Sequence, residues 1–225
     1  PLADFGKRAS YESTSGDIHY WGVWHGKEPF ENFKEKIGRF MSEYGFQSFP
    51  EFKTVKSYTI PADWDINSEV MSAHQRSGIG NQRIKMYMDW YYREPKDFHS
   101  LLYVGQVLQA EGIKMAIEAH RAKMPYCMGT LYWQLNDCWP VTSWSGIDYF
   151  GRWKALHYFA KKAFENVVII PLEEKGNLNI FIVSDRLKTF PAELHLEIAD
   201  FSGNQLWQQK SSITVKPNTS HHYFS

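Results

Sequence analysis

The hydrophobic pattern of this chain changes its period near Asn166, and this change limits the folds that the chain can adopt. Before that point, residues 127–133 are continuously apolar or small, which is typical of a parallel strand buried on both faces. Apolar residues recur at helical spacing over 97–123, where Asp97 can cap the first turn, and again over 152–164. Strands that alternate with helices predict an α/β fold with a parallel sheet.

Beyond Asn166 the pattern indicates strands only. The strand-like segments are residues 167–171, 178–184 and 193–200. A Ser-Gly-Asn turn signal follows them, starting at residue 202. We therefore predict an α/β domain over residues 1–165 and an all-β domain over residues 166–225.

Glu43 ends a short apolar run and is followed almost at once by a glycine, Gly45. A strand end that leads into a loop can keep a carboxylate ionised, fixed in direction and open to a pocket. These are the conditions under which a carboxylate attacks the anomeric carbon of a sugar. An ordinary surface glutamate beside a turn shares this local pattern, so the assignment of Glu43 as a nucleophile depends on the rest of the chain.

Two other segments, residues 16–26 and 129–159, combine aromatic rings with amide, imidazole and carboxylate groups. Such a mixture suits a sugar, because rings stack on C–H faces while polar groups pair with hydroxyls. Large rings also fill protein cores, and we expect that role for Trp153 but a sugar contact for Trp133. The weaker candidates for lining the same pocket are Trp21, Trp24, His25, Asn136, Asp137 and Trp144.

Three blocks of the sequence resemble the β-mannosidases of glycoside hydrolase family 2. They are GDIHYWGVWHG, GRFMSEYGFQSFPE and GTLYWQLNDCWPVTSWSGIDYFGRWKALHYF, and they occur in the family's order within residues 1–164. The resemblance implies a retaining glycosidase that releases terminal non-reducing β-D-mannose from a β-mannoside or a mannose-containing oligosaccharide. It also implies that Glu43 is the nucleophile, that His19 contacts it and that Trp133 forms the platform under the sugar.

The same resemblance implies a (β/α)8 TIM barrel followed by an immunoglobulin-like β-sandwich. Such a barrel takes about 250 residues and a seven-stranded sandwich about 100 residues, whereas the chain before Asn166 has room for only part of a barrel. The family's acid/base glutamate follows an asparagine in a block that this sequence lacks. We therefore expect the C-terminal part of a barrel over residues 1–165 and an incomplete sandwich over 166–225. The expected partner is the missing N-terminal part of the same enzyme, without which the chain should be inactive.

Two alternatives remain open. One is a related barrel enzyme that acts on another sugar, such as a β-galactosidase or a β-glucuronidase, which would share the carboxylate chemistry. The other is a carbohydrate-binding module without catalysis, which would use the aromatic segments but would need no carboxylate beside a stacking ring. The position of Glu43 relative to Trp133 discriminates an enzyme from such a module.

Charge and cysteine content limit the partners of the chain. Lys plus Arg and Asp plus Glu both number 25, and the resulting net charge of +0 argues against nucleic acid or an anionic membrane as a partner. The histidines and cysteines have no metal-ligand spacing, so we expect no metal and no cofactor. Cys127 and Cys138 are expected to be buried free thiols. The family resemblance alone implies an extracytoplasmic location, either periplasmic or lysosomal.

Overall fold

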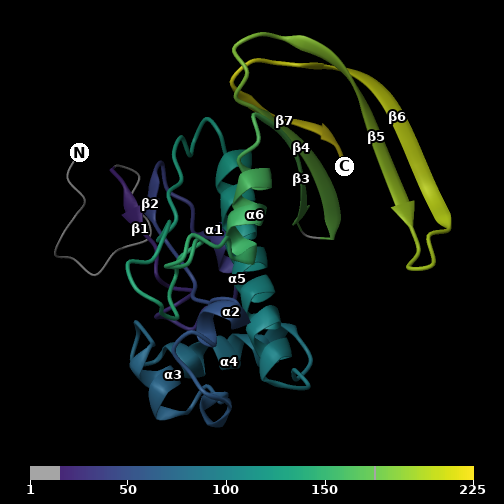
Figure 1. Cartoon of the computed structure of the whole chain (residues 1–225). Coiled ribbons are helices and arrows are strands. Elements are labelled where there is room, and N and C mark those ends of the chain that lie inside the picture. Colours follow the sequence, from purple (N-terminus) through teal and green to yellow (C-terminus); the bar gives the residue numbers. More distant parts are fainter. Residues whose placement is uncertain (1–15, 175) are drawn as a thin grey trace. The chain divides into compact units, whose positions relative to one another are not determined.

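The computed structural model of the chain describes residues 16–174 and 176–225. The chain divides into two compact units, Pro1–Phe164 and Glu165–Ser225 (Figure 1). The first unit combines helices with short parallel strands, and the second consists of antiparallel strands. The chain therefore has an α/β part followed by an all-β part.

Three parallel segments form the sheet of the first unit. Strands β1 (Ile18–His19) and β2 (Met41–Glu43) pair in parallel. A third extended segment, residues 128–133, also pairs with β2 in parallel, and the backbone N–H of Trp133 donates to the Tyr44 carbonyl at 2.7 Å. β2 is therefore the middle segment, and the carboxyl ends of all three lie at the same edge.

The extended segment 128–133 is the strand predicted over residues 127–133, but it is not buried on both faces. Cys127 is buried, whereas Met128, Leu131 and Trp133 are 55%, 55% and 44% exposed. The prediction of burial on both faces is wrong for this chain because the segment lies at the edge of the three. The apolar run alone could not distinguish an edge strand from a central one.

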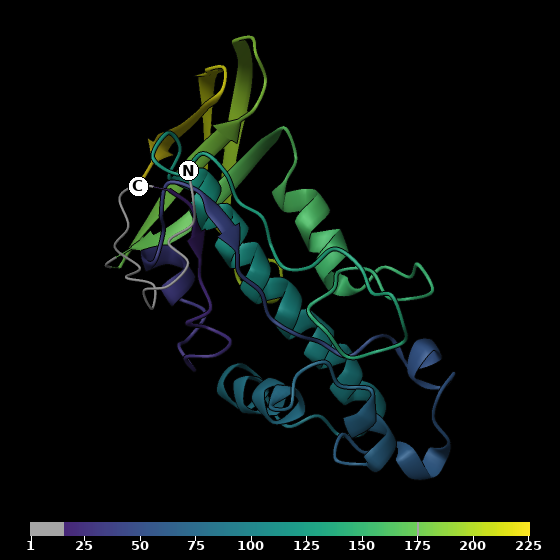
Figure 2. The same ribbon diagram turned by 90° about the vertical axis from the view of Figure 1, so that its left-hand side faces the viewer.

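Helices make up most of the first unit. They are α1 (Asn32–Glu35), α2 (Phe52–Val55), α3 (Glu69–Ala73), α4 (Gly80–Tyr91), α5 (Phe98–Ala122) and α6 (Ala155–Ala163), with a 3₁₀ turn at Pro61–Asp63. The long helix α5 packs against α1, α4 and α6 (Figure 1 and Figure 2). The helix predicted over 97–123 is confirmed, and the Asp97 carboxylate accepts a hydrogen bond from the Ser100 N–H at 2.7 Å. The helix predicted over 152–164 starts later, at Ala155, because Lys154 has an extended backbone.

The second unit contains two antiparallel sheets. Strands β3 (Val167–Glu174), β4 (Asn177–Ser184) and β7 (Thr219–Phe224) form one sheet, and β5 (Phe190–Ala199) pairs with β6 (Gln205–Val215) in the other. Ile182, Leu194 and Val215 form a buried apolar cluster with one residue each from β4, β5 and β6. The three strands predicted from the sequence are present as β3, β4 and β5. Strands β6 and β7 were not predicted, because their sequences carry few apolar residues.

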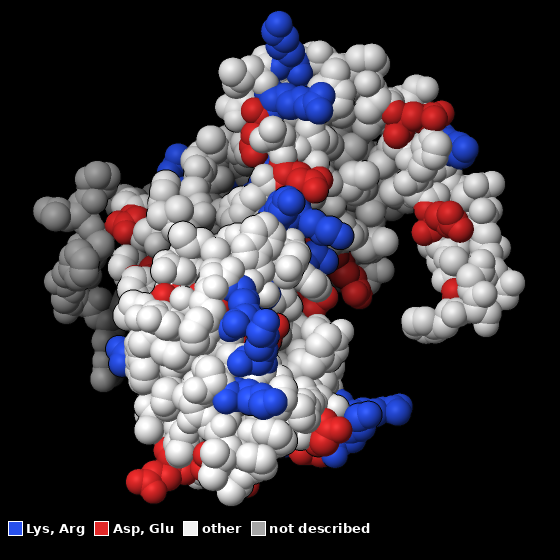
Figure 3. Space-filling view, viewed as in Figure 1, with Lys and Arg blue, Asp and Glu red and all other residues white. Residues whose placement is uncertain are grey.

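Both cysteines are free thiols, as predicted, and Cys127 is buried. The prediction of burial is wrong for Cys138, which is exposed. Acidic and basic side chains both occur on the face shown in Figure 3. Within the described residues, no helix is long and apolar enough to cross a membrane. Over 16–174 and 176–225, no group of three or more His, Cys, Asp or Glu residues is placed to hold a metal ion.

Candidate active site

Glu43 lies at the carboxyl end of β2, and two residues from the β1 segment approach its carboxylate. The Trp21 indole N–H donates a hydrogen bond to Oε1 at 2.8 Å. The Nδ1 atom of His19 lies 3.6 Å from the same oxygen. The Glu43 side chain is 26% exposed, so the carboxylate is held through one oxygen and is still accessible to a ligand.

His19 lies between two carboxylates. Its Nε2 atom is 3.6 Å from Oδ2 of Asp17, which also accepts a hydrogen bond from the Ser42 hydroxyl at 2.5 Å. That hydrogen bond, with a smaller contribution from His19, lowers the pKa of Asp17, so this carboxyl group stays ionised at neutral pH. Asp17 and Ser42 were not predicted as site residues. The spacing of two between Asp17 and His19, which places both on one face of a strand, is the signal that could have identified Asp17.

Gly45, two residues after Glu43, allows three tryptophans to approach the end of β2. A Cβ atom at this position would lie 2.4 Å from the Trp133 carbonyl oxygen, 3.1 Å from the Trp21 ring and 3.2 Å from the Trp144 ring. Only a residue without a side chain fits so close an approach. The structure therefore brings Trp133 and Trp21 together at the turn that follows Glu43, and Trp133 remains half-exposed there.

The other aromatic candidates surround Trp21. The half-buried Trp144 ring lies 6.1 Å from the Trp21 ring, and the exposed His25 ring lies 5.4 Å from it. Trp24 is fully buried and packs edge-on against Phe46 and Trp144. A fully buried ring cannot line an accessible pocket, so we assign Trp24 to the core and not to the site.

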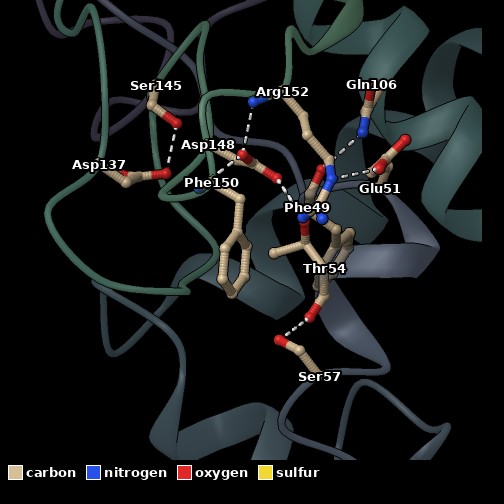
Figure 4. A network of polar contacts seen from close by, with 10 residues as sticks. All are labelled: Phe49, Glu51, Thr54, Ser57, Gln106, Asp137, Ser145, Asp148, Phe150 and Arg152. Carbon is tan, nitrogen blue, oxygen red and sulfur yellow. Dashed lines mark hydrogen bonds and ion pairs between the residues drawn. The ribbon is translucent and has the colours of Figure 1, made fainter.

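The polar candidates Asn136 and Asp137 differ from each other in exposure. Asp137 is buried, and its two carboxylate oxygens accept hydrogen bonds from the Ser143 and Ser145 hydroxyls, each at 2.6 Å. Figure 4 shows the contact with Ser145. Asn136 is exposed, and its side-chain amide donates to the Asp137 carbonyl at 3.4 Å. Asp137 therefore supports the loop that follows Trp133, and we do not assign it a contact with a ligand.

Gln109 of α5 connects the loop after Glu43 with the loop after Trp133. Its side-chain carbonyl accepts a hydrogen bond from the Ser48 hydroxyl at 2.6 Å. Its amide N–H groups donate to the Phe46 carbonyl at 2.8 Å and to the Trp144 carbonyl at 3.1 Å. Because Gln109 is fully buried, these hydrogen bonds are shielded from water and fix the two loops against each other.

Lys154 makes a second connection between the same loops. Its buried ammonium donates to the Ser48 and Ser143 carbonyls at 3.0 and 3.2 Å. Burial lowers the pKa of Lys154 to about 7, although Asp137 and Asp148 act in the opposite direction. This role could not be predicted, because every residue has a backbone carbonyl that can accept a hydrogen bond and the pairing leaves no mark in the sequence.

A charged network holds the turn at residues 148–152 against the start of α2. Arg152 Nη1 donates to Thr54 Oγ1 at 2.8 Å, and Arg152 Nε lies 3.1 Å from Glu51 Oε1 (Figure 4). The buried carboxylate of Asp148 accepts hydrogen bonds from the Thr54 hydroxyl and from the Arg152 backbone N–H. These residues support the loop that follows Trp133 and do not touch Glu43 in the structure.

The chain is similar to known proteins along most of its length. Residues 176–225 match the family model described as Mannosidase Ig/CBM-like domain. β-Mannosidase from Rattus norvegicus is 31% identical over 208 residues, which are 87% of this chain and 23% of that protein. β-Mannosidase B from Thermothelomyces thermophilus is 36% identical over 172 residues, which are 71% of this chain and 20% of that protein.

Solved structures show the same relationship. The crystal structure of a β-D-mannosidase from Dictyoglomus thermophilum matches with a TM-score of 0.88 and 32% identity, over 93% of this chain and 26% of that chain. An exo-chitosanase from Amycolatopsis orientalis matches with a TM-score of 0.73 at 17% identity, over 93% of this chain and 26% of that chain, which shows a shared fold. The chain spans less than a quarter of the length of the rat and fungal relatives. It is therefore a relative of the β-mannosidases, as its three sequence blocks indicate.

Proposed function

We propose that this chain forms the C-terminal part of the catalytic barrel of a retaining β-mannosidase, with Glu43 as the nucleophile. The position of the Glu43 carboxylate carries the proposal. It lies at the carboxyl end of a parallel strand, is hydrogen-bonded by Trp21 at 2.8 Å and is 26% exposed. The half-exposed Trp133 stands at the end of the neighbouring segment, where its ring would stack on the sugar that Glu43 attacks.

The proposal includes a fold: the first unit would be part of a (β/α)8 barrel. β1, β2 and residues 128–133 would be three consecutive barrel strands, and a barrel carries its active site at the carboxyl ends of its strands. The exposed Met128 and Leu131 lie on the edge segment, where a further strand would cover apolar side chains and pair with the backbone. The second unit would supply five strands of an immunoglobulin-like sandwich, in line with the family model that it matches.

Retaining hydrolysis needs two carboxyl groups about 5–5.5 Å apart, one as nucleophile and one as acid and base. Glu43 would take the first role. Asp17 is an unsuitable second carboxyl group, because its hydrogen bond with Ser42 keeps it ionised and therefore without a proton to donate. We assign the acid/base role to a residue of the same enzyme outside this chain.

A panel of 4-nitrophenyl glycosides tests this function. The full-length protein that contains this chain should cleave the β-mannoside with a higher kcat/KM than the β-galactoside, β-glucuronide and β-glucosaminide, and should release mannose with retained configuration. Residues 1–225 alone should cleave none of them, because the acid/base residue is absent. Faster cleavage of another glycoside would assign the site to another sugar, and binding without cleavage would favour a carbohydrate-binding module.

Trp133→Ala should reduce kcat/KM on β-mannosides by about two- to thirteenfold, because an aromatic contact of this kind contributes about 0.5–1.5 kcal/mol beyond its area. Folding should be affected less, since a half-exposed ring loses far fewer contacts than a buried one, whose truncation costs about 3–5 kcal/mol. The core role expected for Trp153 is wrong, because its ring is 41% exposed and packs against His157 and Tyr158 on α6. Trp153→Ala is therefore a matched control with similar exposure. Unfolding curves and kinetics of both variants should show a loss of activity for Trp133 alone.

A further inference from the structure

We propose that the Trp21 indole N–H stabilises the Glu43 carboxylate as the leaving group of the second chemical step. The inference rests on the proposed function and assigns a distinct role to a residue that the sequence marked only as a weak candidate for lining the pocket. It depends on which oxygen of Glu43 is held, how firmly Trp21 is fixed, and where negative charge develops during the reaction.

The two residues that approach the Glu43 carboxylate, Trp21 and His19, both lie beside the same oxygen, Oε1. Trp21 donates to Oε1 at 2.8 Å, and His19 Nδ1 lies 3.6 Å from Oε1. No residue within the described range 16–174 makes a hydrogen bond to Oε2. Oε2 is therefore the oxygen that is free to attack a sugar, and Oε1 is the oxygen that the protein holds.

The indole is fixed in place before any substrate binds. Its ring lies nearly perpendicular to the Trp144 ring, at 79° and 6.1 Å, and 5.4 Å from the His25 ring. The Trp21 carbonyl accepts a hydrogen bond from the His25 N–H at 2.8 Å, which anchors the backbone. A donor that is already oriented needs no reorganisation when charge develops opposite it.

In the first step, Oε2 forms a bond to the anomeric carbon and the bond from that carbon to the leaving oxygen breaks. The leaving oxygen takes its electron pair and a proton from the acid carboxyl group that the proposed function places outside this chain. Glu43 is now an ester, and Oε1 is its neutral carbonyl oxygen. The hydrogen bond from Trp21 weakens, because bonds to charged acceptors are about twice as strong as bonds to neutral ones.

In the second step, water attacks the anomeric carbon and gives a proton to the acid/base group, while the bond to Oε2 breaks. The electron pair returns to the Glu43 carboxylate, and negative charge is again shared with Oε1, opposite the Trp21 N–H. The hydrogen bond therefore strengthens as the ester breaks. Trp21 thus lowers the free-energy barrier of the second step, measured from the ester intermediate. It does not lower the barrier of the first step, in which the carboxylate loses its charge.

Trp21→Phe in the full-length protein removes the N–H and keeps an aromatic ring. With 2,4-dinitrophenyl β-mannoside, whose leaving group makes the first step fast, we expect the second step to slow by about tenfold. Because only the second step slows, kcat and KM should fall together, and kcat/KM should stay within about threefold of the unmodified protein. A burst of dinitrophenolate, with an amplitude close to the enzyme concentration, should also appear. Rates are expressed per active site by titration with a 2-deoxy-2-fluoro mannosyl fluoride, which corrects for misfolded protein.

Two further variants separate the donor from the ring. Trp24→Phe makes the same change in a buried indole whose nitrogen has no hydrogen-bond partner among the described residues, and it should leave kcat and KM per active site unchanged. Trp21→His keeps a ring nitrogen at the position of the indole N–H and should recover part of the lost rate.

A fall in kcat/KM with unchanged KM would overturn the inference, because Trp21 would then serve the first step. Equal effects of Trp21→Phe and Trp24→Phe would also overturn it. If the unmodified protein does not cleave the β-mannoside, the proposed function itself is wrong, and that result is visible without any Trp21 variant.

Discussion

Glu43→Gln in the full-length protein should reduce turnover of β-mannosides by at least about a thousandfold, because an amide cannot form the covalent ester through which a retaining enzyme works. The fold should be unaffected. The side chain is 26% exposed, and its carbonyl oxygen can still accept the hydrogen bond from Trp21. Steady-state kinetics and unfolding curves on the same preparation measure both quantities.

A covalent label identifies the nucleophile independently of the substitution. A 2-deoxy-2-fluoro mannosyl fluoride should modify Glu43, and peptide mapping should find the sugar on the segment that contains it. Glu35→Gln is a suitable control, because Glu35 is an exposed carboxylate at the end of α1. The assignment would be wrong if the label appeared on another residue or if the Glu35 and Glu43 variants were equally active.

The position of Glu43 could be predicted from the sequence because it depends on local chemistry. A short apolar run followed by a glycine defines a strand end, and the structure has β2 ending at Glu43 with Gly45 in the turn. The start of helix α5 was predictable for a similar reason, since the Asp97 side chain caps the helix by accepting a hydrogen bond from the backbone N–H of Ser100, only three residues later. Signals of this kind need only residues that are close in the sequence.

Roles that depend on distant residues could not be predicted. Trp21 and Trp24 are the same residue type, three positions apart, yet one holds the Glu43 carboxylate and the other fills the core. The partners of Gln109 and Lys154 are up to 63 and 106 residues away. Several of them are backbone carbonyls, which leave no residue-specific signal. Tertiary packing decides which of several similar side chains meets the site.

Gly45→Ala should lower both the folding stability and the activity, although the backbone dihedral angles at this position do not require a glycine. A Cβ atom there would lie 2.4 Å from the Trp133 carbonyl oxygen, and backbone cannot yield as a flexible side chain can. Overpacking of this kind costs about 1–3 kcal/mol of folding free energy. The displacement would also separate Trp133 from Glu43, and a misplacement of about 1 Å can cost about a hundredfold in rate.

Gly78→Ala is the matched control, because a Cβ atom at that exposed glycine would meet nothing within 4 Å. It should leave kcat/KM unchanged and should not lower the free energy of unfolding. Unfolding by denaturant and kinetics on a β-mannoside compare the two variants directly. If Gly45→Ala were as stable and as active as Gly78→Ala, the close contact between the turn after Glu43 and Trp133 would be disproved. The proposed site would then lose the feature that places its carboxylate beside its aromatic platform.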